Sequence, residues 1–553
     1  MKRRDFLKST VPAAILPSIL NGFSMKAYAA SSPLVQALMN TNTDTDHVLV
    51  IIQLSGGNDG LNMVIPNDIY STYYNARANI AIPQNKILGL NGYANSGLHP
   101  SMTGLQTMYN EGKLAIVQSV SYPTPNFSHF RATDIWMSGS DSNTYVSSGW
   151  AGRYLSSEYD NPNNSKPPQY PDNYPNASMT DPLAIQIGSI TSLALQGPDV
   201  NMGISISDPT SFYNFLNGVQ DPTPNTPWGN ELSFVRQVAT QTQQYAAVVK
   251  AAAAKVPAQG AYPSGNDLAA QLKIVAQLIK GGLKTRVYMV STGGFDNHSG
   301  QVVTTDTTTG THANLMARIS AGIKAFSDDL KGLGIEDRVL GMTFSEFGRR
   351  VKSNANYGTD HGVASPLFVF GKNVKSGVLG TSPVISTKAA NGTEIISDNV
   401  PMQYDFRSVY ASLLSDWFCV NGSTLQSVML NNYQTLPLIG TSSCQVALAT
   451  TGINGQNHAG IDQNRADSDQ LITNYPNPFA DTTKITFRTK GGHTMVQIMD
   501  TQGKILTVLT DKLYAPGLYT INFDSGMLPV GIYYARFQNG PVQQVRPMLK
   551  VKP

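Results

Sequence analysis

The strongest constraint on the fold is an order of segments that occurs twice in the middle of the chain. A helical stretch at 268–281 leads into the apolar run "TRVYMVST" and then into "GGFDNHSGQ". The helical stretch "ANLMARISAGIKAFSDDLKGLG" leads in the same way into "RVLGMTF" and then into "SEFGRR". Two further continuous runs, "HVLVIIQL" (47–54) and "KLAIVQSV" (113–120), are typical of strands buried on both faces of a sheet. The pattern predicts an α/β domain, a sheet flanked by helices, with another helical stretch expected at 230–256.

Composition and charge narrow the class of protein. With 553 residues, of which 41% are hydrophobic and 14% charged, the chain can bury a large core and is expected to hold more than one domain. The formal net charge is +3, and the first 29 residues contribute +5 − 1 = +4 of it, which leaves a remainder near −1. This balance argues against nucleic acid or an anionic membrane surface as the main partner.

The N-terminus has the pattern of an export signal. "MKRRDFLKSTVPAAILPSIL" combines a twin-arginine start with a short apolar stretch, and small residues follow at Ala27-Tyr28-Ala29. We therefore expect a twin-arginine signal peptide at 1–29, a mature chain that starts near Ala30, and export through the periplasm. The alternative is a membrane anchor, but Pro12 and Pro17 break the apolar run, which is shorter than the roughly 20 residues that a bilayer span needs.

The pattern changes near residue 450. The segment 449–470 is polar and rich in Gly, Asn and Asp, as linkers are, and it separates a main domain at 30–448 from short, mostly alternating apolar runs at 471–553. These runs predict a small all-β sandwich. Its end motifs, "NYPNPFADTTKITF" and "LPVGIYYARFQNGPVQQVRPMLKVKP", resemble the type A C-terminal sorting domain of the type IX secretion system. The resemblance implies the outer-membrane secretion machinery as a partner and an extracellular or cell-surface location; the alternative is a carbohydrate-binding sandwich.

Only two cysteines are present, Cys419 and Cys444. In an oxidising compartment they can close one loop, so we expect a disulfide, with a pair of buried thiols as the alternative.

Acids and histidines follow the predicted strands, where open α/β sheets gather their ligands. They are Asp59 in "LSGGNDG", Asp296 and His298 in "GGFDNHSG", Glu346 in "FSEFGRR", and Asp360 and His361 in "YGTDHGVASPLFVFG". Each has a simpler explanation as a turn, a surface ion pair or a solvated side chain. Together, however, carboxylate oxygens and imidazole nitrogens are what a divalent ion of the Zn, Mn or Mg type requires. The sequence therefore predicts a metal site at this edge of the sheet.

A candidate nucleophile lies in "PTPNFSHFRATDIWMSG", where the pattern becomes helical after Asn126. Ser128 would then sit at the first turn, where free backbone N–H groups and the helix dipole favour an alkoxide and a bound phosphate or sulfate. The alternative is that Ser128 only caps the helix.

At these residues the chain resembles a known family. The motifs "LVIIQLSGGNDGLNMVIP", "PNFSHFRATDIWMSGS", "GWAGRYL", "GGFDNHSGQ", "TFSEFGRR", "GTDHGVASPLFVFG" and "DFRSVYASLLSDWF" are similar to the domain-of-unknown-function family 1501, over roughly residues 45 to 420. That family resembles the alkaline phosphatase and sulfatase superfamily, whose site holds two metal ions. By order, the resemblance implies Asp59 as the first acid, Ser128 as the nucleophile, Asp296 and His298 as one metal pair, Glu346 as the acid of the second pair, and His361 as the last histidine.

The departures from that pattern concern the second metal. Phe347 stands where the second pair would have its histidine. The metal position of Asp296, His298 and His361 therefore has more of its expected ligands than the position of Asp59, Glu346 and Ser128. The latter either stays empty or is completed by Asp360 or His129. Neither cysteine has the Cys-x-Pro-x-Arg context of a formylglycine sulfatase.

The resulting prediction is a secreted or surface-attached, metal-dependent hydrolase of phosphate or sulfate esters. It would bind one or two divalent ions, Zn or Mn, and an anionic ester or glycan ligand. Two alternatives are a catalytically silent surface protein of the same fold that binds a glycan or polyanion, and a purely structural surface-layer component.

Overall fold

The computed structural model describes most of the chain: residues 18–20, 23–25, 45–159, 179–209, 245–440, 444, 470–475 and 479–550, apart from gaps at 257, 390, 421, 501–503, 516, 527 and 541. The chain divides into two compact units, Met1–Gly452 and Ile453–Pro553. Most of the predicted signal peptide, nearly all of the predicted linker and the first part of the expected helix at 230–256 lie outside the described residues. Within the predicted signal, β1 (Ser18–Leu20) pairs antiparallel with β2 (Phe23–Met25).

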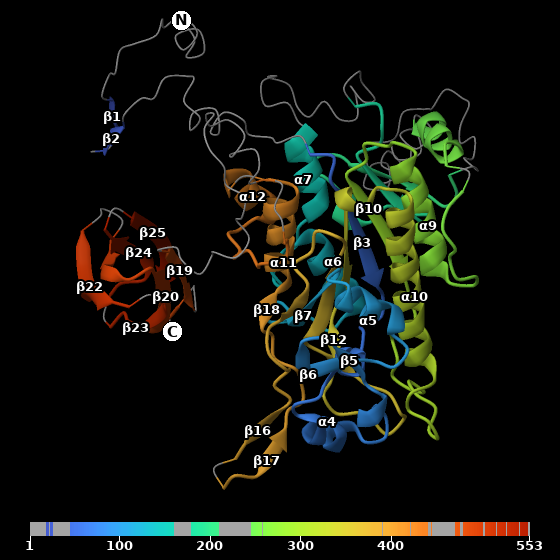
Figure 1. Cartoon of the computed structure of the whole chain (residues 1–553), viewed down its shortest axis with the longest axis horizontal. Coiled ribbons are helices and arrows are strands. Elements are labelled where there is room, and N and C mark those ends of the chain that lie inside the picture. Colours follow the sequence, from blue (N-terminus) through green and yellow to red (C-terminus); the bar gives the residue numbers. More distant parts are fainter. Residues whose placement is uncertain are drawn as a thin grey trace, which may run out of the picture. The chain divides into compact units, whose positions relative to one another are not determined.

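A nine-stranded sheet is the centre of the first unit (Figure 1). Its order is β15-β7-β14-β11-β3-β10-β8-β9, and β18 pairs with β7 beside this path. The bounds are β3 (Val48–Leu54), β7 (Leu114–Ser121), β8 (Ala184–Ile187), β9 (Gly203–Ile206), β10 (Val287–Thr292), β11 (Val339–Phe344), β14 (Ser365–Phe370), β15 (Gly377–Leu379) and β18 (Tyr404–Asp405). The pairings are parallel except for those of β14, which runs antiparallel to β7 and β11.

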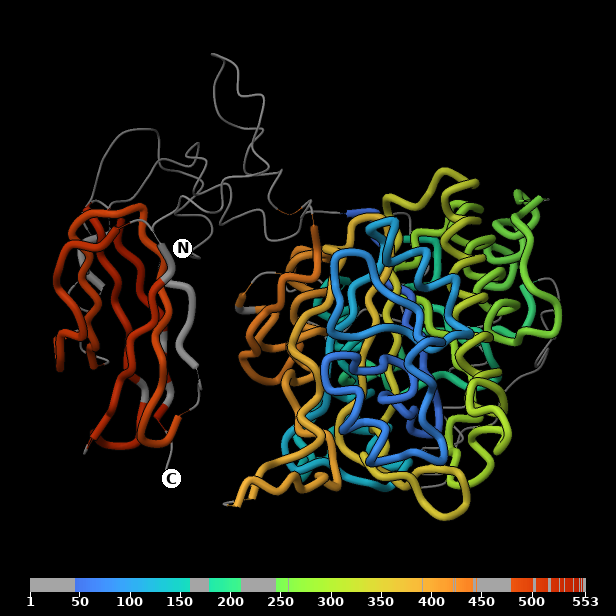
Figure 2. The backbone as a smooth tube through the Cα atoms, turned by 60° about the horizontal axis from the view of Figure 1, so that its bottom comes forward, coloured from blue at the N-terminus to red at the C-terminus, as the bar shows by residue number. Residues whose placement is uncertain are grey.

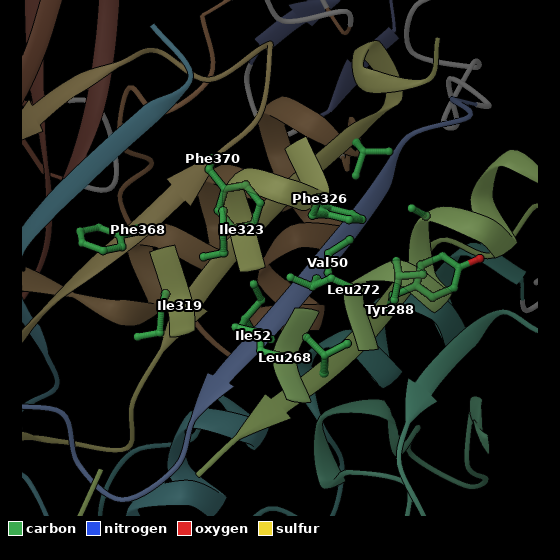
Figure 3. Close-up of a cluster of buried hydrophobic side chains, with 14 of the residues drawn as sticks. Val50, Ile52, Leu268, Leu272, Tyr288, Ile319, Ile323, Phe326, Phe368 and Phe370 are labelled. Atoms are coloured by element: carbon green, nitrogen blue, oxygen red, sulfur yellow. The ribbon is translucent and has the colours of Figure 1, made fainter. Parts of the chain in front are cut away.

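Helices cover both faces of this sheet, which explains why its strands read as continuous apolar runs. In β3, Val50 and Ile52 belong to one core, while Leu49 and Ile51 belong to the other. The first core packs against α5 (Thr103–Asn110), α9 (Asp267–Lys280) and α10 (Thr311–Gly332); the second packs against α6 (His129–Ser138), α7 (Trp150–Tyr159) and α11 (Phe406–Ser412). Figure 3 shows side chains of α9 and α10 meeting those of the strands. The predicted α/β architecture is confirmed.

Local sequence signals set the start of α9. The Asn266 side chain caps this helix by accepting a hydrogen bond from the Ala269 N–H at 3.0 Å, and Asp267 occupies the first turn. Seven buried apolar residues lie along one face of the helix. The stretch predicted at 268–281 is therefore confirmed as a helix. Of the stretch predicted at 230–256, residues 245–254 are helical.

Smaller elements surround the edge of the sheet where the acids lie. These are α3 (Gly60–Met63), β4 (Val64–Pro66), α4 (Tyr70–Arg77), β5 (Leu88–Leu90), β6 (Tyr93–Leu98), and the ribbon of β12 (Gly348–Arg349) with β13 (His361–Gly362). A hairpin of β16 (Ser386–Lys388) and β17 (Glu394–Ile396) projects from the body of this unit (Figures 1 and 2). Near its end, α12 (Gly422–Met429) follows Cys419, which forms the expected disulfide with Cys444.

The second unit is all-β, as its sequence predicts. Two antiparallel sheets have the strand orders β19-β20-β23 and β22-β21-β24-β25. The bounds are β19 (Gln470–Tyr475), β20 (Thr482–Thr489), β21 (Gly492–Met499), β22 (Ile505–Tyr514), β23 (Gly517–Asp524), β24 (Gly531–Asn539) and β25 (Val542–Lys550). Phe487 of one sheet and Phe537 of the other share one buried core, so the sheets pack face to face (Figure 2).

Among the described residues of both units, no helix combines the length and the apolar character needed to cross a bilayer.

Candidate metal centre

The topology brings the predicted site residues to one edge of the sheet. The segments after β3, β10 and β11 leave the carboxyl ends of neighbouring parallel strands. β14 is antiparallel, so its amino end lies at this same edge, and β13 with His361 comes just before it. The segment after β7 leads into α6, which begins at His129. Residues more than 200 positions apart therefore meet at one place, as ligand sites do in open α/β sheets.

Three imidazole rings point their Nε2 atoms at the carboxylate of Asp296. His298 Nε2 lies 3.2 Å and His361 Nε2 lies 3.5 Å from Asp296 Oδ1, and His129 Nε2 lies 3.6 Å from Asp296 Oδ2. The Nε2 atoms of His298 and His361 are 3.0 Å apart. His129, Asp296 and His361 each offer a ligand atom, and these three atoms lie within 4.8 Å of one another.

The other ring nitrogen of each histidine already has an acceptor. Nδ1 of His129 lies 2.9 Å from Glu346 Oε1, and Nδ1 of His298 lies 3.2 Å from Asp360 Oδ1. Nδ1 of His361 lies 2.8 Å from the carbonyl oxygen of Phe127. Carboxylate and carbonyl oxygens only accept, so each Nδ1 carries a proton, and the ring in its neutral form has its lone pair at Nε2. Metal-binding histidines are oriented in this way.

These distances fit a divalent ion. Bonds of about 2.0–2.1 Å in a tetrahedron place ligand atoms about 3.3–3.4 Å apart. The separations of 3.2 and 3.5 Å from Asp296 Oδ1 and of 3.0 Å between His298 and His361 are close to that spacing, and His129 lies 3.6 Å from the other oxygen, Oδ2. At 3.0 Å, the Nε2 atoms of His298 and His361 are close enough for both to bind one cation when the rings are neutral. The donor set of three imidazoles and one carboxylate is of the kind that zinc prefers.

Arg349 forms an ion pair with Asp296. Its side chain is fully buried, and Nη2 donates to Asp296 Oδ1 at 2.7 Å. The same guanidinium donates to four backbone carbonyls, those of Gly56, Gly57, Phe295 and Thr359. Partial burial alone would raise the pKa of Asp296, but the hydrogen bond and charge of Arg349 outweigh it and hold the pKa below its usual value. Asp296 is therefore an anion at neutral pH.

The surroundings of His361 favour the neutral form of its imidazole. Burial lowers the pKa of its imidazole, and the nearby Arg349 charge lowers it further, against the opposing effect of the Phe127 carbonyl. The ring of Phe347 packs on it, with ring centroids 4.4 Å apart, and lies 4.9 Å from the ring of His129. Phe347 stands where the resemblance would place a metal histidine, and it forms instead an apolar wall behind two of the imidazoles.

Glu346 and Asp360 contact the Nδ1 atoms of His129 and His298, on the side of each ring away from Asp296. Glu346 is 1% exposed, and its Oε1 accepts hydrogen bonds from His129 and from the backbone N–H of Gly56 at 2.8 Å. Asp360 accepts from His298 and, at 3.3 Å, from the Asn354 amide. The His298 hydrogen bond lowers the pKa of Asp360 below its usual value, against a small opposing effect of burial. Both carboxylates orient an imidazole in this arrangement.

Asp59 lies apart from the imidazoles. Its carboxylate is 2% exposed, and both of its oxygens accept from Arg77, at 2.8 and 2.7 Å, while Oδ2 also accepts from the Gln301 amide at 2.6 Å. Burial would raise the pKa of Asp59, but the Arg77 charge outweighs it, and the pKa is lowered.

Ser128 is the residue that immediately precedes α6, and it is exposed. It occupies the N-cap position, but its side chain makes no capping hydrogen bond. Its backbone N–H donates instead to the Asn126 side chain at 2.8 Å. The hydroxyl is therefore not used to cap the helix, and it lies one residue from His129.

Two residues of the centre were not assigned to it from the sequence. The sequence places His129, like His298 and His361, at a strand-to-helix junction and suggests it for the second metal position, but it does not single out Arg349. The signal for His129 is its place at the start of a helix that follows the buried strand β7. Arg349 lies three residues beyond Glu346, but nothing in the sequence shows that its side chain turns inward.

Comparisons with known proteins identify two segments. Residues 230–429 match the model of the family described as "Protein of unknown function (DUF1501)", and residues 473–550 match the "Secretion system C-terminal sorting domain". The first match includes Asp296, His298, Glu346, Asp360 and His361, but not Asp59, Ser128 or His129. Curated proteins include no significant match.

Solved structures similar to this chain include sulfatases and alkaline phosphatases. A sulfatase from Pseudoalteromonas sp. is 12% identical, with a TM-score of 0.30 over 90% of this chain and 87% of that one. A protein in the alkaline phosphatase superfamily from Vibrio parahaemolyticus is 12% identical, with a TM-score of 0.31 over 92% and 82%. The alkaline phosphatase of the Antarctic bacterium TAB5 is 10% identical, with a TM-score of 0.22 over 58% and 91%.

The C-terminal match bears on where the protein goes. A sorting domain of this type indicates export to the cell surface or the extracellular space and implies the secretion machinery as a partner. Residues 230–429 thus match the family DUF1501, and residues 473–550 match a secretion-system C-terminal sorting domain.

Proposed function

We propose that this protein is a secreted, metal-dependent hydrolase of phosphate or sulfate esters. The observation that carries the proposal is the convergence of three Nε2 atoms on the carboxylate of Asp296, with every Nδ1 bound to an acceptor. The ligands would be His129, Asp296, His298 and His361. A divalent ion held there would polarise a bound anionic ester.

The position of Ser128 supports a nucleophilic role. It precedes the first turn of a ten-residue helix, and the first turn of any α-helix leaves backbone N–H groups without intrahelical partners. Such a turn attracts an anion. The hydroxyl of Ser128 is free of a capping bond and adjoins a ligand histidine, so an ester bound at the centre would lie near it.

The remaining side chains hold the ligands in place. Glu346, Asp360 and the Phe127 carbonyl each fix one imidazole, and Arg349 fixes the carboxylate. Preorganisation of this kind keeps the site from rearranging during the reaction. Phe347 covers two of the rings with apolar surface, which keeps water from that side.

The proposal is tested by measuring metal content and turnover together. The natively purified full-length protein should contain zinc or manganese by mass spectrometry and should hydrolyse at least one of an aryl phosphate, a bis-aryl phosphate and an aryl sulfate. Ser128→Ala should retain the metal and lose turnover by at least about 100-fold. The control, Ser142→Ala, changes a partly exposed serine in the loop after α6 and should alter neither.

Three results would contradict the proposal. Metal without any turnover would favour the silent surface protein that binds a glycan or polyanion. Neither metal nor ligand binding would favour a structural component. Full turnover by Ser128→Ala would contradict the nucleophilic role of Ser128, although metal-dependent hydrolysis would remain.

A further inference from the structure

The carboxylate of Asp59 is fully committed to protein donors. The side chain of Arg77, the last residue of α4, is 0% exposed, and its Nη1 contacts both oxygens of Asp59. Gln301, also 0% exposed, donates to Oδ2. An ion bound to Asp59 would have to displace the guanidinium and leave it buried without a counter-charge, which is strongly unfavourable. Asp59 is therefore poorly suited to bind a metal.

Arg77 also donates hydrogen bonds to the segment that follows β12. The ribbon of β12 and β13 carries Arg349 and His361 of the metal centre. Its Nε donates to the carbonyl of Val351 at 2.8 Å, and its Nη2 donates to the carbonyl of Arg350. These residues follow β12, whose Arg349 holds Asp296 and pairs in register with His361 of β13. The position of Arg77 thus determines where the end of β12 lies.

A second connection runs from Asp59 through Gln301. The Oε1 atom of Gln301 accepts from the hydroxyl of Thr359 at 3.2 Å, and its backbone N–H donates to the carbonyl of Tyr357 at 2.8 Å. Thr359 lies two residues before His361 and is fully buried. Asp59 therefore reaches the His361 segment from a second side.

The other carboxylate of the possible second metal position is committed as well. Oε1 of Glu346 accepts from Gly56 N–H and faces His129 Nδ1, and Oε2 lies 3.4 Å from the Ser345 hydroxyl. Asp59 and Glu346 thus each hold a neighbouring side chain, and Arg77 neutralises Asp59.

We infer that the Asp59–Arg77 pair is a positioning clamp that takes the place of a second metal ion, so that the protein binds one divalent ion per chain. The inference rests on the proposed metal site at Asp296 and extends it. The guanidinium supplies a permanent positive charge and a planar fork of donors, which a lysine cannot reproduce. It connects Asp59 to two backbone carbonyls in one rigid unit.

The test uses the full-length protein, stripped with a chelator and titrated with Co²⁺ and Zn²⁺. The wild-type protein should bind one equivalent, with the visible absorption of a tetrahedral Co²⁺ site. Asp59→Asn should still bind one equivalent. Arg77→Lys should also bind one equivalent, but with about 10- to 100-fold weaker affinity and a shifted Co²⁺ spectrum. The reason is that a lysine cannot make all the hydrogen bonds by which the Arg77 guanidinium holds the ribbon of Arg349 and His361.

Two further variants make the result unambiguous. Thr359→Val removes only the hydroxyl that bonds Gln301 and should shift the Co²⁺ spectrum less than Arg77→Lys, so the inference stays testable even if the arginine variant does not fold. Asp328→Asn, which breaks an exposed ion pair with Lys324 on α10, should change neither stoichiometry nor spectrum.

Other outcomes separate this inference from the proposed function. Two equivalents bound by the wild type and one by Asp59→Asn would overturn the clamp, whether or not esters are hydrolysed. An unchanged spectrum in both Arg77→Lys and Thr359→Val would reduce the pair to a purely structural role and also overturn it. One equivalent bound without turnover would leave the clamp intact and contradict only the hydrolase.

Discussion

Two carboxylates at the same edge of the sheet have opposite surroundings. The side chain of Asp296 is 50% exposed, and it faces one arginine and three imidazoles. The side chain of Asp59 is 2% exposed, and both of its oxygens accept from Arg77. The difference shows that the position of an acid after a strand does not decide its role. An acid that faces lone pairs suits a cation, whereas an acid saturated by donors holds the structure.

The histidines show the same contrast. His129, His298 and His361 lie in part at the surface, where their Nε2 atoms converge. His99 and His312 are almost completely buried, with ring centroids 5.9 Å apart. His312 Nε2 lies 3.2 Å from the Asn58 side-chain oxygen. The buried pair serves packing, and the partly exposed set is free to bind.

The largest expected effect is on the free energy of unfolding, which should respond differently to the loss of a buried and of an exposed carboxylate. Asp59→Ala should lower the free energy of unfolding of the metal-free protein by about 3–5 kcal/mol, because it leaves the buried Arg77 guanidinium unpaired. Asp360→Ala removes a carboxylate that is 53% exposed and should cost about 1 kcal/mol or less. Urea unfolding of both variants measures the difference, and equal costs would break the comparison.

The lowered pKa values of the two buried histidines, His99 and His312, should make the protein less stable at acidic pH. Burial lowers the pKa of His312 to about 4 and that of His99 to about 3, from 6.5. The unfolded chain therefore binds more protons below pH 6.5, so stability should fall as the pH drops from 6.5 toward 4, by about 3 kcal/mol for His312 alone. Denaturant midpoints across this range measure the loss. His312→Gln should flatten it, and an equally steep loss in that variant would contradict the assignment.

Substitution of Glu346 should have a smaller effect than the changes in stability above, and it should act on metal affinity. Glu346→Gln weakens the acceptor of the His129 proton and should reduce zinc affinity about 10- to 100-fold, without removing the ion at saturating concentrations. Competition with a chromophoric chelator measures the affinity. The control is Glu336→Gln, which weakens a partly buried ion pair with Lys113 and should leave the affinity unchanged. A complete loss of metal in Glu346→Gln would make Glu346 a ligand instead.

The smallest effect is expected from the C-terminal unit. Deletion of residues 471–553 should leave the melting temperature of the first unit nearly unchanged, because the hydrophobic cores of the two units are made of separate residues. Calorimetry of the truncated protein tests this. Loss of cooperative melting would show that the units depend on each other.

The sequence predicts the fold, and the edge of the sheet at which these acids and histidines gather, for identifiable reasons. The strands are continuous apolar runs because helices cover both faces, and that pattern is visible without a structure. Acids after β10 and β11 share an edge because those strands are both parallel to β3. The disulfide between Cys419 and Cys444 was expected from their number and compartment, and it is present.

The roles of individual residues could not be predicted in the same way. The pairing of Asp59 with Arg77 depends on how α4 packs under the ribbon of β12 and β13, which no local pattern encodes. The orientation of His129 depends on Glu346, which lies 217 positions away in the chain. Whether a side chain faces lone pairs or donors is a property of the assembled structure.

The central claim is that one metal ion binds among His129, Asp296, His298 and His361. It is tested most directly by an anomalous difference map at the zinc edge, from crystals of the natively purified, zinc-loaded protein. We expect one peak, at about 2.0–2.2 Å from the three Nε2 atoms and the Asp296 carboxylate. A peak between Asp59 and Glu346, or no peak at Asp296, would contradict the account.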